Sequence, residues 1–194
     1  MGMQRQGKSE LTKWFIRRRS RPVLIVNPLD EKYPGLKFAK YDYARPDLAV
    51  IDYILKKGFT ISQPINLVTN DPEHFHNACE IVKRHKTITL VLDEIDQFDS
   101  PNYTDPSFFD LINYGAGHYE ADIITTSRRP ADISKTLRSQ TQEWYIFRIQ
   151  EPGDKDYLKK IHKDFPRLVE SLPFYYYVFY NTMDAPEVRP PISI

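Results

Sequence analysis

Short apolar runs alternate with stretches of helical periodicity along most of the chain. Most of these runs are apolar at every position, so both faces of the sheet they form are expected to be covered by helices. This order predicts an α/β fold with a mainly parallel sheet, in which residues 23–26, 88–92, 122–126 and 144–149 share one sheet. The full set of expected strands is 23–26, 65–68, 88–92, 122–126, 144–149 and 174–180.

Amphipathic stretches between these runs predict the helices. Leu11 and Phe15 lie on one side of the first stretch, and Asn70 or Asp71 can cap the one that runs to about His85. Pro46 can start a helix whose apolar stripe is Leu48, Ile51, Ile54 and Leu55. Residues 29–45 are expected to form an irregular loop. The expected helices are 8–19, 46–55, 70–85, 106–114, 130–138 and 153–162.

Length and composition indicate one soluble globular domain. The chain has 194 residues, of which 41% are hydrophobic and 27% charged. We expect the domain to span 1–182 and an extended, proline-containing tail to span 183–194. Cys79 is the one cysteine, which excludes an intrachain disulfide, and no apolar run approaches the ~20 residues of a membrane helix. The net charge of +1 means that any DNA contact must come from local patches or from ring geometry.

A phosphate-binding loop is predicted at the start of the chain, where residues 2–9 match the pattern G-x-x-x-x-G-K-[ST]. Lys8 would reach the β- and γ-phosphates of ATP, and Ser9 would bind Mg²⁺. A helix N-terminus that follows the loop favours anions. The alternative is a chance match in a basic segment. The expected nucleotide contacts come from Gly2, Gln4, Arg5, Gln6, Gly7, Lys8, Ser9 and Glu10.

Two carboxylates follow the apolar strand at 88–92. Asp93 would hold Mg²⁺, directly or through water, and Glu94 would orient or deprotonate the attacking water. Ligands of open parallel sheets bind at the carboxyl ends of the strands, where these residues are expected. The alternative is a strand that ends in a charged turn, although the phosphate loop about 80 residues earlier favours the catalytic interpretation.

A third polar segment follows the strand at 122–126. Ser127 would lie beside the γ-phosphate, and Arg128 and Arg129 could stabilise negative charge in the transition state. Ser127 could also cap a helix that begins near Pro130, and the two interpretations are compatible.

Together these motifs resemble the HerA/FtsK-type ATPases. Arg129-Pro130 resembles the second half of a Thr-Gln-Arg-Pro signature, and Val26-Asn27-Pro28 resembles a strand that ends in Asp-Pro. The order of Ser139-Gln140, a strand at 146–149 and Asp154 is also similar, so the resemblance spans about residues 2–160.

The resemblance implies a RecA-like (ASCE) P-loop NTPase fold. It also implies that subunits assemble into a ring, usually a hexamer, with ATP and Mg²⁺ at the boundaries between subunits. It also implies double-stranded DNA in the pore. Small members of this kind resemble the genome-packaging ATPases of tailless icosahedral viruses. A viral capsid or vertex protein is then an expected partner, and the host cytoplasm or the virion is the expected location.

Three features depart from the family pattern. The strand that precedes the phosphate loop in the family is not found before Gly2, so an upstream or separate segment would have to supply it. Arg128 replaces the family's sensor glutamine. Residues 115–118 lack the arginine that acts across the subunit boundary, so Arg128 or Arg129 is expected to take that role.

Two other functions remain open on the sequence. A Zot-like filamentous phage assembly ATPase shares much of this core, although such proteins usually carry a membrane segment. An ATP-binding structural or regulatory subunit with little turnover is the other alternative, and Glu94 argues against it. The basic run at 17–21 could contact DNA phosphates, or it could simply stabilise the end of its helix.

Overall fold

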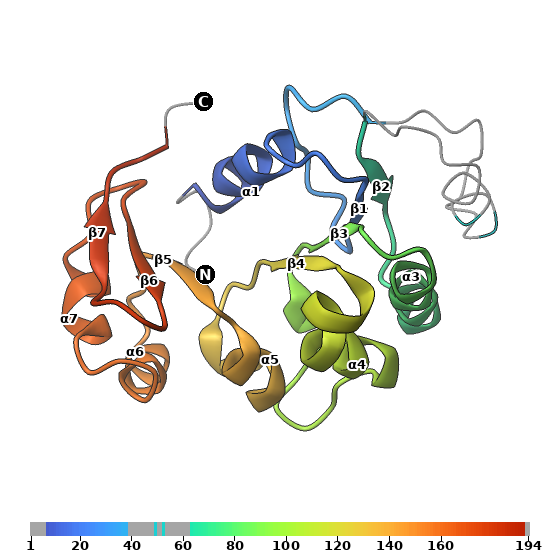
Figure 1. Cartoon of the computed structure of the whole chain (residues 1–194). Helices are drawn as coiled ribbons and strands as arrows, with labels where there is room; N and C mark the ends of the chain where they lie inside the picture. Colours follow the sequence, from blue (N-terminus) through green and yellow to red (C-terminus); the bar gives the residue numbers. More distant parts are fainter. Residues whose placement is uncertain (1–6, 39–48, 50–51, 53–62, 193–194) are drawn as a thin grey trace.

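The computed structural model describes residues 7–38, 49, 52 and 63–192. The helix expected from Pro46 lies outside the described residues, apart from two helical positions at Ala49 and Asp52. Figure 1 shows two sheets with helix α1 (Lys8–Arg17) between them.

The larger sheet is fully parallel and has the order β2-β1-β3-β4. Its register places Val26 beside Leu92 and Leu92 beside Thr125, so the carboxyl ends of the three strands β1, β3 and β4 lie level. The strands are β1 (Val23–Val26), β2 (Ile65–Leu67), β3 (Thr89–Leu92) and β4 (Asp122–Thr125).

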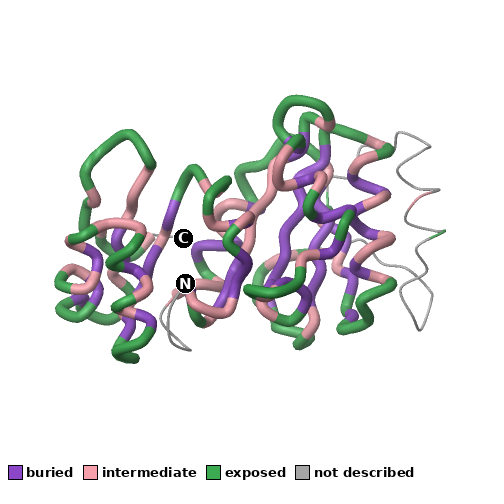
Figure 2. The backbone as a smooth tube through the Cα atoms, turned by 90° about the horizontal axis from the view of Figure 1, so that it is seen from below, coloured by how far each residue is buried: buried purple, intermediate pink, exposed green. Residues whose placement is uncertain are grey.

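Helices cover both faces of this sheet, as the apolar runs predict. One face packs its alternate residues, such as Leu24 and Leu90, against α3 (Pro72–His85) and α4 (Pro106–Tyr114). The other face packs Ile25 and Val91 against Ile16 of α1 and against Tyr33. Buried residues accordingly concentrate in the strands and on the inner sides of the helices (Figure 2).

The prediction that residues 144–149 belong to the same sheet is wrong. Strand β5 (Glu143–Phe147) pairs antiparallel with β6 (Tyr177–Asn181), which pairs antiparallel with β7 (Glu187–Arg189). Trp144, Ile146 and Val178 form a separate core with α6 (Pro152–Lys159) and α7 (Phe165–Glu170). An apolar run predicts a buried strand, but the same run can pair with either of two sheets.

Helix α1 joins the two sheets. Ile16 packs on the parallel sheet, whereas Leu11 packs on Phe147 and Tyr177 of the antiparallel sheet. The phosphate-loop helix therefore contacts both halves of the molecule.

Some element boundaries differ from the sequence-based expectation. The helix expected at 130–138 is split into a 3₁₀ turn (Pro130–Asp132) and α5 (Lys135–Gln140), because Ser134 caps α5 through the Leu137 N–H. The last aromatic strand begins at Tyr177 and not at residue 174. Asp71, and not Asn70, caps α3 by accepting a hydrogen bond from the Glu73 N–H.

Candidate nucleotide site

The phosphate-loop helix begins at a glycine that the local geometry requires. Gly7 has φ of 102°, which a residue with a side chain rarely adopts. A β-carbon at this position would also lie 3.3 Å from Phe147 Cε1. Gly7, Lys8, Ser9 and Glu10 are described, whereas the other expected nucleotide contacts, Gly2, Gln4, Arg5 and Gln6, lie outside the described residues.

Lys8 and Glu94 meet across the carboxyl edge of the parallel sheet. Lys8 Nζ donates to Glu94 Oε1 over 3.2 Å and to the Ser127 carbonyl over 3.4 Å. Both charged side chains are largely buried, with 11% and 15% of their surfaces exposed. Three segments that are distant in sequence therefore converge on one ammonium group.

Arg128 holds the other side of the Glu94 carboxylate. Its Nε lies 2.9 Å from Glu94 Oε2, an ion pair that lacks the alignment of a hydrogen bond. A second nitrogen of the guanidinium donates to Asp96 Oδ2 over 3.2 Å. Asp96 is therefore also part of this ion-pair network.

Burial raises the pKa of Glu94 above its ordinary value, while the positive charge of Lys8 acts in the opposite direction. The residue also has φ of 47°, in the left-handed region that is costly for a residue with a side chain. Its N–H is held by the Thr126 hydroxyl over 2.9 Å. The backbone and the neighbouring charges thus hold this carboxylate in one place.

Asp93 is held by two hydroxyl groups. Tyr33 donates to its Oδ2 over 2.8 Å, and Thr126 donates to its Oδ1. Tyr33 is buried, and burial followed by the nearby Asp93 charge raises its pKa, so it remains a phenol donor. Tyr33 lies in a segment that the sequence presents only as an irregular loop, and no local motif identifies it.

The segment that carries Tyr33 also brings a further carboxylate to the site. The buried Asn27 side chain makes two hydrogen bonds with the backbone of Glu31. Its Oδ1 accepts from the Glu31 N–H over 2.8 Å, and its Nδ2 donates to the Glu31 carbonyl over 3.0 Å. Ser9 Oγ then donates to Glu31 Oε1 over 3.4 Å. Asn27, directly after β1, therefore holds a turn that brings an acidic group beside Ser9.

These residues fit a magnesium ion that is bound together with a nucleotide. Mg²⁺ prefers oxygen ligands and is commonly held by one or two carboxylates, water and substrate phosphates. Asp93 and the Ser9 hydroxyl are the oxygen groups predicted for it, and Asp93 already accepts one hydroxyl at each oxygen. Among the described residues, no group of three His, Cys, Asp or Glu could hold a metal without such phosphates.

Comparison with known proteins identifies the fold. No protein-family model matches the chain, and no curated protein matches it. Its structure does match the genome packaging NTPase B204 of Sulfolobus turreted icosahedral virus 2 in complex with sulfate. The TM-score is 0.78 at 18% identity, over 99% of this chain and 94% of that chain. The chain has the fold of a viral genome-packaging NTPase.

Two further structures agree with this packaging-NTPase fold. The complex of the same B204 with AMPPCP has a TM-score of 0.77 at 18% identity and covers 100% of this chain and 96% of that chain. B204 of Sulfolobus Turreted Icosahedral Virus, a DNA-packaging ATPase, has a TM-score of 0.78 at 19% identity and covers 99% and 95%. The predicted P-loop α/β fold is confirmed, including helices on both faces of a parallel sheet.

Within the packaging-NTPase fold, the two neighbouring arginines point to different partners. Arg128 pairs with Glu94 and Asp96, whereas Arg129 Nε lies 3.1 Å from the buried Asp154 of α6. Ser127 contributes its carbonyl to Lys8, while its hydroxyl bonds to the backbone of Arg129. Arg129 therefore links the end of the parallel sheet to the smaller sheet's helices.

Residues 115–118, where the expected arginine is missing, lie away from the nucleotide site. The same is true of Arg19 and Arg21 in the basic run at 17–21. Residues Gly115–Tyr119 form a π-helical turn just before β4 begins, at the amino edge of the sheet. Arg19 and Arg21 pair there with Asp122. In the part of the chain that the structure describes, no helix combines the length and the apolar character needed to cross a membrane.

Proposed function

We propose that this protein hydrolyses ATP and uses the energy to move double-stranded DNA during packaging of a viral genome. One observation carries the proposal: Lys8, Glu94 and Arg128 meet beside Asp93 at the carboxyl edge of a parallel sheet. This is the edge where open α/β sheets bind ligands. B204 of Sulfolobus turreted icosahedral virus 2, a genome packaging NTPase of the same fold, has been solved with ATPγS and AMPPCP.

The contacts suggest how the site would work. The α1 N-terminus and Lys8 would bind the β- and γ-phosphates, with Ser9 and Asp93 facing the ion. Mg²⁺, when bound with ATP, neutralises phosphate charge. The phosphates would compete with Glu94 for Lys8, so Glu94 would lose one of its two cationic partners. That carboxylate could then accept a hydrogen bond from the attacking water.

The finer parts of the proposal concern assembly. We propose a homo-oligomeric ring, hexameric as the family resemblance implies, with DNA in its pore and a viral capsid or vertex protein as partner. Such a protein would act in the host cytoplasm and at the virion. Half-exposed Arg129, beside the nucleotide edge, remains the candidate for a contact across the subunit boundary.

A second candidate is an ATP-binding regulatory subunit with little turnover. The observation in its favour is that both cations of the site contact Glu94, which would keep that carboxylate away from water. The DNA-moving ATPase and the regulatory subunit would therefore differ in the rate of ATP hydrolysis and not in their affinity for ATP.

Double-stranded DNA is expected to increase the ATPase rate of the purified chain several-fold at low salt, and this increase is expected to disappear at high salt. Phosphate release with Mg²⁺-ATP, with and without linear DNA, measures both effects. The Glu94→Gln protein is the control for contaminating ATPase. Hydrolysis that DNA does not change would contradict the DNA motor, and ATP binding without hydrolysis would favour the regulatory subunit.

Arg128→Ala is expected to reduce turnover roughly 10- to 100-fold, because Glu94 loses a group that positions it. Arg128→Lys keeps the charge but not the two-pronged contact with Glu94 and Asp96, so it should restore only part of the rate. Because Arg128 contacts Glu94 of its own chain, a mixture of Arg128→Ala and Glu94→Gln chains should regain no activity in mixed rings. Recovered activity would instead assign Arg128 to the neighbouring subunit's site.

A further inference from the structure

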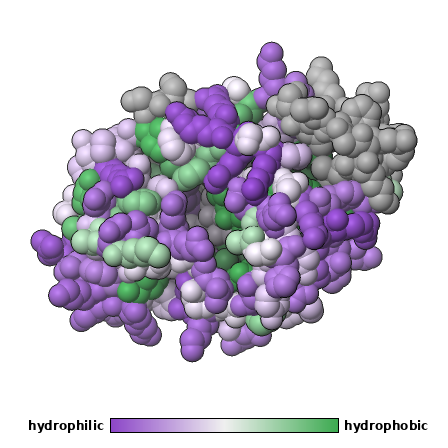
Figure 3. All heavy atoms as spheres, viewed as in Figure 1, coloured by the Kyte–Doolittle hydropathy of each residue, from purple (hydrophilic) through white to green (hydrophobic). Residues whose placement is uncertain are grey.

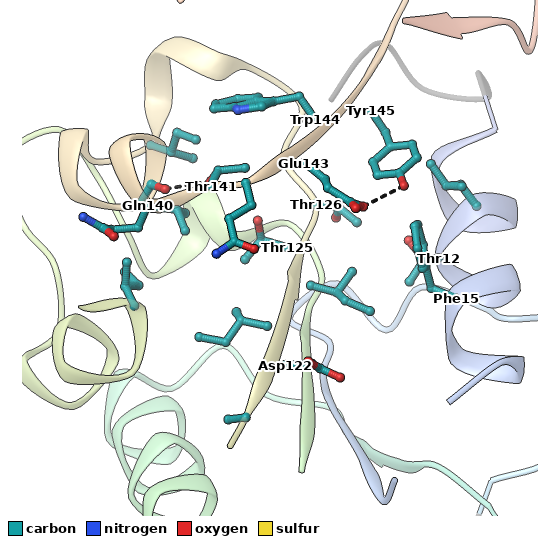
Figure 4. A pocket seen from close by; sticks show the side chains of 18 of the residues that line it. Thr12, Phe15, Asp122, Thr125, Thr126, Gln140, Thr141, Glu143, Trp144 and Tyr145 are labelled. Atoms are coloured by element: carbon teal, nitrogen blue, oxygen red, sulfur yellow. Dashed lines mark hydrogen bonds between the residues drawn. The ribbon is translucent and has the colours of Figure 1, made fainter. Parts of the chain in front are cut away.

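A groove of about 430 Å³ separates β4 of the parallel sheet from β5 of the smaller sheet, and α1 lies beside it. Lys8 and Phe15 line the groove from α1, and Tyr145 and Phe147 line it from β5. Figure 3 shows the surface hollowed between the two halves of the molecule, and Figure 4 shows Tyr145 between β5 and Phe15. The two rings are 5.2 Å apart. The smaller sheet therefore presents aromatic side chains to the phosphate-loop helix.

Two aromatic side chains of the smaller half reach the start of α1. A β-carbon built on Gly7 would lie 3.3 Å from Phe147 Cε1 and 3.6 Å from Tyr175 Cδ1. Phe147 is buried, and its ring lies 5.7 Å from that of buried Tyr177. Tyr175 differs from both, because 52% of its surface is exposed. The aromatic surface therefore ends in an exposed tyrosine beside the residue that precedes Lys8.

The backbone holds Tyr175 in a conformation that a tyrosine rarely adopts. The Tyr176 N–H donates to the Pro173 carbonyl over 3.2 Å, which closes a four-residue turn with Tyr175 in third place. The φ of Tyr175 is 67°, in the left-handed region, where turns favour glycine or asparagine at this place. Residues held in such conformations cluster at ligand sites. Glycine would suit the turn better, so the tyrosine side chain indicates a role beyond the fold.

A second exposed ring lies next to Tyr175. Phe174 takes the second place of the turn, and 64% of its surface is exposed. The two ring centroids are 6.4 Å apart. Exposed aromatic side chains beside a phosphate site fit a flat aromatic ligand, because bases stack readily on such rings. The base of ATP is a flat aromatic group that is covalently joined to the phosphates.

We propose that Tyr175 stacks on the base of the bound nucleotide, with Phe174 beside it. This inference rests on the proposed ATP site and assigns the residue that holds the end of the nucleotide opposite the phosphates. Stacking uses the face of the base, which adenine and guanine both offer. Tyr175 therefore strengthens the binding of ATP and GTP to the same extent and does not select between them.

Calorimetric titration of the Tyr175→Gly protein with Mg²⁺-AMPPCP, and separately with inorganic tripolyphosphate, tests the proposal. Affinity for AMPPCP should fall about 5- to 150-fold, the range for the loss of one stacked base. The corresponding guanosine analogue should lose the same factor. Affinity for tripolyphosphate, which has no base, should not change. Tm should stay equal or rise, because glycine adopts the φ of this turn without strain.

Two matched variants serve as controls. Tyr175→Phe keeps an aromatic ring, so it should bind AMPPCP nearly as the unchanged protein does. Tyr114→Ala removes a tyrosine that is similarly exposed, at 50%, from the end of α4, and both affinities should stay the same.

Unchanged AMPPCP affinity in Tyr175→Gly would overturn the stacking proposal and leave the nucleotide site intact. An equal loss of affinity for AMPPCP and tripolyphosphate would also overturn it, because Tyr175 would then act on the phosphate loop and not on the base. If the unchanged protein bound neither ligand, the nucleotide site itself would be rejected, and the stacking proposal with it. The failure of stacking alone is therefore distinct from the failure of the proposed function.

Discussion

ATP hydrolysis is expected to fall about 10²- to 10⁴-fold in the Glu94→Gln protein, the range that a general base typically contributes. Glutamine keeps the size of the side chain, and its one amide oxygen can still accept a hydrogen bond from Lys8, but it cannot take a proton from water. ATP affinity should change little, because Glu94 acts on water and not on the nucleotide. Phosphate release and equilibrium binding of a fluorescent ATP analogue measure the two quantities separately.

The matched control is Glu170→Gln. Glu170 forms an exposed ion pair with Lys155 on the smaller half of the molecule, and such pairs contribute little to stability. The Glu170→Gln protein should hydrolyse ATP at the same rate as the unchanged protein. Hydrolysis by Glu94→Gln at the unchanged rate would rule out Glu94 as the base.

Lys8→Ala is expected to weaken ATP binding roughly 30- to 4000-fold, which corresponds to the ~2–5 kcal/mol lost when one partner of a desolvated charge pair is removed. The phosphates would lose the ammonium group, and Glu94 would remain in the site with Arg128 as its only cationic partner among its described contacts. The negative charge of Glu94 would then face the phosphates with only Arg128 to compensate it. Titration of the ATP analogue measures the change.

Lys160→Ala provides the control, because Lys160 is an exposed lysine that follows α6 and lies outside the nucleotide site. It should bind ATP as the unchanged protein does. The two site variants should also differ from each other, since Glu94→Gln binds without turning over and Lys8→Ala hardly binds. Unchanged affinity in Lys8→Ala would contradict the phosphate-loop assignment.

Local sequence patterns were sufficient to predict that the candidate catalytic residues lie at the carboxyl edge of the parallel sheet. The apolar runs before Asn27, Asp93 and Thr126 predict strands, and the polar residues at their ends must lie at the same edge if the strands are parallel. Residue spacing alone places Lys8 at the start of a helix. These inferences depend on periodicity and on short motifs, which lie within one element.

Contacts between distant segments were not predictable in the same way. Tyr33 bonds to Asp93, 60 residues away, and nothing in its own loop indicates that partner. Arg128 and Arg129 are neighbours in sequence, but they pair with different carboxylates, Glu94 and Asp154. Their different partners depend on where the loop after β4 places each side chain.

The sequence by itself therefore determined most of the elements, the sheet that contains β1, β3 and β4, and the motif residues at its carboxyl edge, because each follows from local periodicity and spacing. Only the tertiary structure decided that β5 joins a second, antiparallel sheet with β6 and leaves a groove beside β4. An apolar strand can pair in either sheet, and strand pairing is settled by the edges and core surfaces that meet in three dimensions. The same packing brings Tyr33, Glu31 and Arg128 to the carboxylates at this edge.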